Sequence, residues 1–186
     1  MSGPTSIEQI GNEALVRIGF PESIGNIYEG TRQARALLEV FAQTRDAMLR
    51  ERDYDFSERI ASAAVSPSSP MPPWNFAYQY PSDCLKIRQL YAASYLTNKN
   101  DPLPFNWTIA FDNLLSAKVI FSNAQTATLI YTKQVTDITQ WDSMFVEALI
   151  AALSRRLPPV LDRLDLYKPE VEDEAKTTAL AAATMG

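Results

Sequence analysis

The proline-rich segment 66–73, with the sequence SPSSPMPP, sets the strongest limit on what this chain can fold into. Proline lacks a backbone N–H and fixes φ, so such a segment can form neither a helix nor a central strand. The pattern of apolar residues along the chain also changes at this segment. Apolar residues recur at helical spacing before it, and β-branched and aromatic runs follow it. We therefore expect 66–73 to be a linker.

Two helices are expected before this linker. The first runs over about 5–18, where Thr5 and Glu8 have the spacing of a capping box and Gly19 is suited to end the helix. The second runs over about 31–52. Its apolar stripe consists of Ala34, Leu37, Leu38, Phe41, Ala42, Met48 and Leu49.

Arg45 interrupts that stripe at a position where an apolar residue is expected. A guanidinium on a buried face needs a carboxylate or a carbonyl as a partner. The sequence leaves two alternatives, an internal ion pair or a contact with another subunit. The simpler interpretation is an internal pair, or a side chain whose aliphatic part is buried while its guanidinium reaches solvent.

The part of the chain after the linker is expected to form an antiparallel sheet of about three to five strands. The strand candidates are rich in β-branched and aromatic residues and are separated by Asn, Asp, Ser and Pro clusters. They are Leu85–Tyr91, Phe105–Phe111, Lys118–Phe121 and Thr126–Gln134.

Helical spacing returns at 142–157, where apolar residues cover most of the circumference. A helix of that kind is buried on several sides. Pro158 and Pro159 are expected to end it. Pro169 then opens a last helix, with acidic residues in its first turn, but the small residues that follow would make it marginal on its own.

These elements predict an α+β fold, a helical bundle with an inserted antiparallel β-sheet subdomain. The expected parts are the N-terminal helical part, the linker, the sheet subdomain, and the C-terminal helical part with a docking tail. Their ranges are 1–65, 66–73, 74–136 and 137–186.

The composition excludes several kinds of chemistry. The chain contains no histidine, and Cys84 is its only cysteine, so the commonest general base and a thiolate metal cluster are both missing. No phosphate-binding glycine motif occurs, and no stretch reaches the ~20 apolar residues of a membrane span. A net charge of −5 has the wrong sign for binding nucleic acid through its phosphates. We expect no enzyme activity, no metal and no cofactor.

Aromatic residues alternate in the run Trp74, Phe76, Tyr78 and Tyr80. As a strand, the run would place the four rings on one face. Stacking of single-stranded nucleic acid is a weak reading, because no basic residue lies between Met71 and Leu85. Core packing or a protein interface is the stronger one.

Three blocks of the sequence resemble the tail tubular protein A-like adaptors of tailed bacteriophages. In the first, a helix ends at Ile-Gly and a long helix carries an aromatic residue, Arg-Asp and Leu-Arg before an aromatic-Asp-Phe segment. The second is FAYQYPSDCL, and the third joins a strand to a buried helix. Their key positions are Ile18-Gly19, Phe41, Arg45-Asp46, Leu49-Arg50 and Tyr54-Asp55-Phe56; Phe76–Leu85; and Tyr131, Val135-Thr136-Asp137, Trp141-Asp142 and Phe145–Leu149.

The resemblance covers roughly 5–91 and 128–157 and implies a virion protein without catalytic activity. In that family, identical subunits form a ring, commonly dodecameric, under the portal protein, and a tail or nozzle protein attaches below. DNA passes through the lumen without specific binding. The implied location is the portal vertex of the virion, after synthesis in the host cytoplasm, with no membrane involved. Segment 92–127 and the proline-led C-terminal helix match the family pattern weakly.

Two groups of residues are the expected contacts with the portal or a neighbouring subunit. The first is the final segment, represented by Pro169, Val171, Ala175, Ala179, Leu180 and Met185. The second is the aromatic group Trp74, Phe76 and Tyr78. Two alternatives stay open at this point, a cellular helical binding module that is a monomer or dimer, and a phage hydrolase that uses a carboxylate pair.

Overall fold

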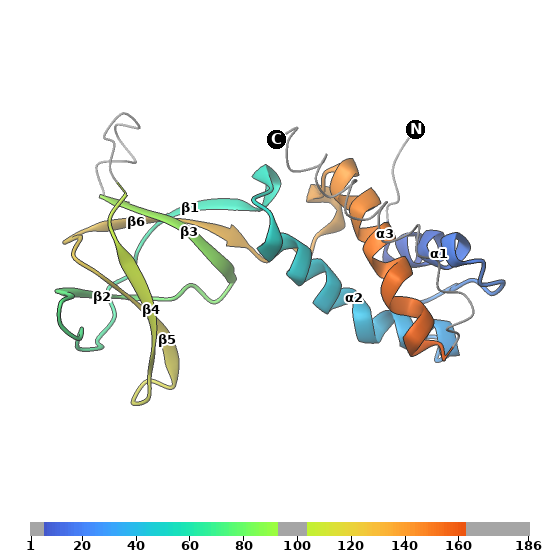
Figure 1. The fold of residues 1–186 in the computed structure, drawn as a ribbon, viewed down its shortest axis with the longest axis horizontal. Helices are drawn as coiled ribbons and strands as arrows, with labels where there is room; N and C mark the ends of the chain where they lie inside the picture. Colours follow the sequence, from blue (N-terminus) through green and yellow to red (C-terminus); the bar gives the residue numbers. More distant parts are fainter. Residues whose placement is uncertain (1–5, 93–103, 163–186) are drawn as a thin grey trace. The chain divides into compact units, whose positions relative to one another are not determined.

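The computed structural model describes residues 6–92 and 104–162 (Figure 1). By contacts the chain divides into two compact units, Met1–Phe56 with Val135–Gly186, and Ser57–Gln134. The helices are α1 Ile7–Ile18, α2 Arg32–Glu51 and α3 Ser143–Val160, with short 3-10 turns η1 Asp55–Ser57 and η3 Ile138–Gln140. The strands are β1 Glu58–Ser62, β2 Phe76–Gln79, β3 Cys84–Ala92, β4 Trp107–Asp112, β5 Ala117–Ser122 and β6 Ala127–Lys133.

The predicted fold class, a helical bundle with one inserted sheet, is wrong. The strands form two separate three-stranded antiparallel sheets, ordered β1–β6–β3 and β2–β5–β4, beside three described α-helices. Spacing of apolar residues identified four of the strands but says nothing about which strands pair. It also missed β1, a five-residue strand with little buried surface that follows the helical region directly.

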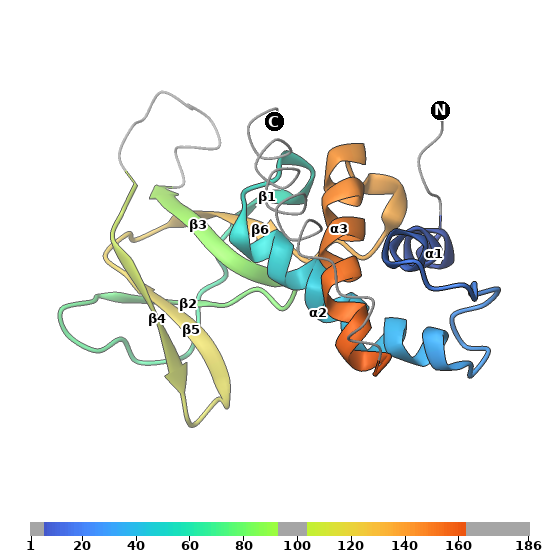
Figure 2. The same ribbon diagram turned by 45° about the vertical axis from the view of Figure 1, so that its right-hand side comes forward.

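The strand unit contains both sheets (Figures 1 and 2). They share one apolar core. The β2–β5–β4 sheet contributes Tyr78 and Ile120, and the β1–β6–β3 sheet contributes Leu90 and Leu129, all at most 1 % exposed. A second cluster, with Val119 and Phe121, covers the opposite face of β5. Strand β5 is therefore buried on both faces, which explains why its sequence does not alternate.

Arg88 links the three strands of the β1–β6–β3 sheet. Its guanidinium, on β3, pairs with the Glu58 carboxylate on β1 at 2.9 Å and donates to the Thr132 hydroxyl on β6 at 3.0 Å. A third bond reaches the Ser57 hydroxyl at 3.2 Å. An arginine fork can make several directed bonds at once, so this side chain fixes the lateral order of the sheet.

In the other unit, α1 and α2 each pack against α3 (Figure 1). Helix α1 begins after Ser6, whose hydroxyl accepts from the Gln9 N–H, and ends at Gly19 with φ 75°. Thr5, the expected cap, lies outside the described residues. The Ser154 hydroxyl on α3 donates to the Ala14 carbonyl on α1 at 3.2 Å. Expected helices over 5–18 and 31–52 are thus confirmed within two residues at each end.

The expectation that Pro158 and Pro159 end the buried helix is wrong, because α3 continues to Val160. Both prolines lie in its last turn. The helix therefore loses only the two bonds that their N–H groups would donate to the Ser154 and Arg155 carbonyls. The Leu161 N–H then donates to the Leu157 carbonyl at 2.8 Å. Burial of Leu157, Pro158 and Leu161 offsets the lost backbone bonds.

Candidate functional site

The first predicted contact group cannot be placed. Residues 163–186 lie outside the described part of the chain, so Pro169, Val171, Ala175, Ala179, Leu180 and Met185 stay predictions.

The aromatic run serves the core of the strand unit. Tyr78, on β2, is 1 % exposed and its hydroxyl donates to the Ala124 carbonyl. Phe76 and Tyr80 pack against the same cluster, as alternation along a strand requires, whereas Trp74 precedes β2 and packs against the cluster on the other face. Partner binding by the run stays a prediction, and its half-buried members Trp74, Phe76 and Tyr80 reach the surface.

Arg45 forms an ion pair within its own chain. Its Nε lies 2.8 Å from Asp46 Oδ1, and its side chain is 10 % exposed. The nearby Thr44 hydroxyl accepts from the Arg156 guanidinium on α3 at 3.1 Å. This pair corresponds to the first of the two alternatives raised by the sequence, and a contact of Arg45 with another subunit stays a prediction.

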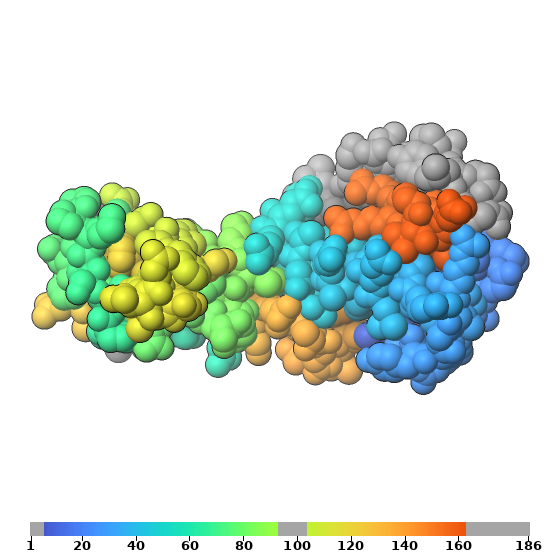
Figure 3. Space-filling model, turned by 90° about the horizontal axis from the view of Figure 1, so that it is seen from below, coloured from blue at the N-terminus to red at the C-terminus, as the bar shows by residue number. Residues whose placement is uncertain are grey.

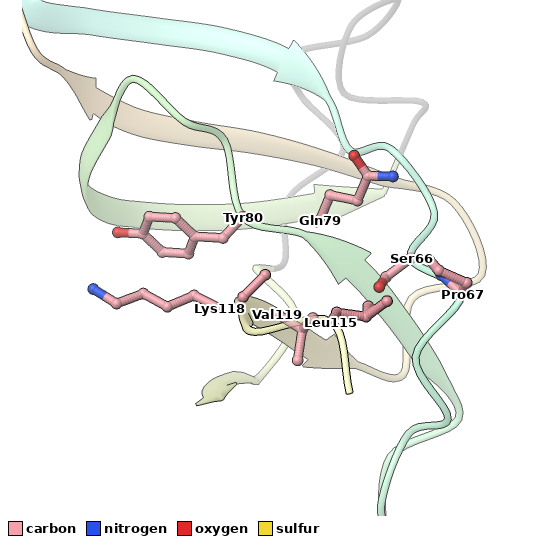
Figure 4. A pocket seen from close by; sticks show the side chains of 8 residues that line it. Ser66, Pro67, Gln79, Tyr80, Leu115, Lys118 and Val119 are labelled. Atoms are coloured by element: carbon pink, nitrogen blue, oxygen red, sulfur yellow. The ribbon is translucent and has the colours of Figure 1, made fainter. Parts of the chain in front are cut away.

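A shallow pocket of about 270 Å³ opens beside the β4–β5 turn (Figure 4). Lys118 and Tyr80 lie at one end, with the Lys118 Nζ 5.4 Å from the centre of the Tyr80 ring, and Ser66 and Pro67 lie at the other. Gln79, Leu115, Ala117 and Val119 complete the lining. One cation, one amide and an apolar floor suit contact with a side chain or a peptide. Among the described residues that line the pocket, none is a carboxylate that could act as a general acid or base.

The β4–β5 hairpin presents apolar side chains to solvent, which the sequence reading missed. Its exposed fractions are 42 % for Ile109, 60 % for Phe111, 97 % for Leu114 and 43 % for Leu115. The hairpin is coloured yellow in Figure 3, which views the surface of the strand unit from below. Trp107, on the same face of β4, packs against the core that the two sheets share, but Ile109 and Phe111 on that face stay exposed. The available signal was Leu114-Leu115, an apolar pair in a turn where polar residues are usual.

Asp112 holds the turn of this hairpin. Its carboxylate accepts from the Ser68 hydroxyl in the linker and from the backbone N–H groups of Leu114 (2.8 Å) and Leu115 (3.1 Å). The Ser68 bond is the main cause of a lowered Asp112 pKa. The Asp112 carboxylate is therefore charged at neutral pH, and its hydrogen bonds stabilise the turn.

The described residues hold no cluster of three or more His, Cys, Asp or Glu that could ligate a metal. Within the same ranges, no helix is long and apolar enough to cross a membrane.

Comparison with known protein families and with curated protein sequences finds no match to this chain.

Proposed function

We propose that this chain is a structural subunit of a phage head-to-tail adaptor, which assembles as a ring between the portal and the tail. The observation that carries the proposal is the order of the three resemblance blocks along the chain. Residues of these blocks also make the helix ends, turns and core contacts described next, as expected of a structural protein.

The first two blocks supply helix ends, turns and core contacts. Gly19 ends α1 in the left-handed conformation that glycine adopts easily. In FAYQYPSDCL, the Cys84 N–H donates to the Pro81 carbonyl at 3.1 Å, which closes the turn from β2 to β3. The Asp83 carboxylate accepts from the Tyr131 hydroxyl at 3.0 Å and so ties this turn to β6.

The third block supplies an aromatic cluster at the start of α3. The Trp141 Nε1–H donates to the Val135 carbonyl at 3.1 Å, and Asp142 caps α3 by accepting from the Met144 N–H at 2.7 Å. Phe145, 0 % exposed, makes edge contacts with the rings of Trp141 and Tyr54 at 5.4 and 5.0 Å. Such pairs stabilise a core beyond their buried area.

The charge of the chain also supports the proposal. A net charge of −5 suits a channel through which DNA slides without sticking. A ring needs heterologous contacts, in which one face of each subunit meets a different face of the next.

The direct test mixes the purified chain with the portal protein from the same genome. Negative-stain electron microscopy and light scattering should show a ring of added density on one end of the portal, with the mass of a whole ring of chains. A chain that stays a monomer or dimer and never binds portal would favour the cellular binding module instead.

A matched pair of variants tests the predicted contacts. A chain lacking 169–186 should keep its circular dichroism spectrum and lose portal binding, whereas Val16→Ala, at an exposed position of α1, should leave binding unchanged. Normal assembly of the truncated chain would refute the contact assignment while leaving the ring proposal intact.

A further inference from the structure

The edges of the two sheets are protected unequally. Exposed strand edges recruit other chains, and natural proteins guard them with charge, bulges or covering segments. Strand β1 carries Glu58 and Arg59. Strand β3 has irregular register on its paired side, and its Leu90 carbonyl accepts from the Phe105 N–H at 2.8 Å. Each of these edges therefore has at least one protective feature.

The edge of β2 is covered by residues 64–66, where the chain enters the linker. The Ser66 N–H donates to the Ala77 carbonyl at 2.9 Å, and the Gln79 N–H donates to the Ala64 carbonyl at 2.8 Å. An isolated bridge also joins Val65 to Tyr78. The segment before β2 thus acts as a partial extra strand.

Strand β4 has only one of these protections, the charge of Asp112 at its end. It pairs regularly with β5 over six residues, without a bulge, lysine, arginine or proline. Within 6–92 and 104–162, no backbone hydrogen bond reaches β4 from the side opposite β5. Ile109 and Phe111, both exposed, lie on the same face of this open edge.

We propose that a second copy of this chain pairs with β4 in antiparallel register about a two-fold axis at Ala110. Opposite residues in an antiparallel pair share a face, so Ile109 lies against Phe111 of the second copy, and Thr108 against its Asp112. A β-branched residue opposite an aromatic one is a favourable cross-strand pair. This register brings together both apolar side chains that β4 exposes.

The charges of β4 are compatible with self-pairing. Asp112 is the only charged residue of the strand. In the proposed register, the two Asp112 residues are offset by four residues, about 14 Å at ~3.4 Å per residue. That distance exceeds a Debye length of about 8 Å at physiological salt, so their repulsion is largely screened. A hydroxyl donor, Thr108, faces each carboxylate.

Pairing would join two three-stranded sheets into one continuous sheet of both copies. The contact is isologous, because the same strand is used on each side. A ring built from heterologous contacts would need other surfaces. The inference therefore goes beyond the proposed function and does not rest on it.

Sedimentation analysis of the full chain tests the association. We expect reversible dimers between about 10 and 500 μM, in the weak range of a small interface. Phe111→Lys should raise the dissociation constant at least tenfold, whereas Val16→Lys, at an α1 position 73 % exposed, should not change it. A wild-type chain that stays monomeric over this range, or a dimer unaffected by Phe111→Lys, overturns the proposal.

Disulfide formation tests the register independently. In a Cys84→Ala background, which removes the only native cysteine, Ala110→Cys should form a crosslinked dimer under mild oxidation, because the residue faces its own copy. Leu114→Cys, although 97 % exposed, should crosslink at least several-fold more slowly. Equal rates, or faster crosslinking at position 114, would refute β4 pairing about Ala110. Both cysteine variants share the Cys84→Ala background, so any loss of stability from that substitution affects both rates.

Discussion

The approach of α1 to α2 depends on one residue without a side chain, Gly11. A Cβ atom there would lie 2.2 Å from Leu37 Cδ2, and Leu37 is 0 % exposed and cannot easily move away. Gly11→Ala should therefore destabilise the chain by about 1–2 kcal/mol, because overpacking outweighs alanine's better helix propensity of about 1 kcal/mol. Urea unfolding measures the change.

The matched control places the same substitution in a Leu37→Ala background. The clash is then absent, so Gly11→Ala should stabilise that variant through helix propensity. Equal effects in both backgrounds would show that the contact with Leu37 does not determine the residue at position 11.

Tyr131 gives the strand unit a dependence on alkaline pH. Burial, with the hydrogen bond to Asp83 as a further cause, raises its pKa from 10.0 to about 12. Between these values the folded chain retains a proton that the unfolded chain has lost, so its stabilising contribution is present below pH 10 and falls as pH rises toward 12. Tyr131→Phe should cost about 1 kcal/mol at pH 8, for the lost hydrogen bond, and less at pH 11.

Chemical denaturation of both chains at the two pH values measures this difference. Tyr54 and Tyr78, whose pKa values are also raised by burial, are present in both chains. Their contributions cancel in the comparison. A cost that stays constant or grows between pH 8 and 11 would contradict the assignment to Tyr131.

At the scale of elements, local sequence patterns predict where helices and strands lie but not which strands pair. Helix stripes and caps located α1 and α2, and β-branched runs located β3 to β6. The two-sheet arrangement escaped prediction, because pairing β6 between β1 and β3 joins segments far apart in the sequence. Exposure of Ile109 and Phe111 escaped it for the same reason. An alternating strand identifies an apolar face but not whether another sheet covers it.

The prolines of α3 allow a test at this scale. Pro159 is exposed in the last turn and deprives the Arg155 carbonyl of its helical N–H donor. Pro159→Ala should stabilise the chain by about 1 kcal/mol, since the restored helix bond outweighs the lost stiffness of the unfolded chain. Pro158→Ala is the control, because Pro158 is buried and the substitution removes core packing. A thermal melt in which Pro159→Ala is less stable than the native chain would mean that the proline ring itself stabilises this end of α3.

At the scale of the whole molecule, the strand unit interrupts the other unit in sequence but closes upon itself. The chain enters through β1 and leaves through β6, which pair with each other, so Glu58 and Thr132 lie opposite one another. Two cuts near these residues would therefore leave neighbouring ends. A domain with adjacent ends and its own core is the kind of segment that can be excised or inserted.

We therefore expect Ser57–Gln134, expressed alone, to fold. Both apolar clusters of the strand unit lie inside this range, as do Arg88 and the three side chains to which it bonds. The isolated segment should show β-type circular dichroism, dispersed amide resonances and one cooperative unfolding transition. A segment cut at residue 126 loses β6, the central strand of its sheet, and should remain unfolded. If 57–134 proves as unfolded as that control, the strand unit depends on the helical unit for its stability.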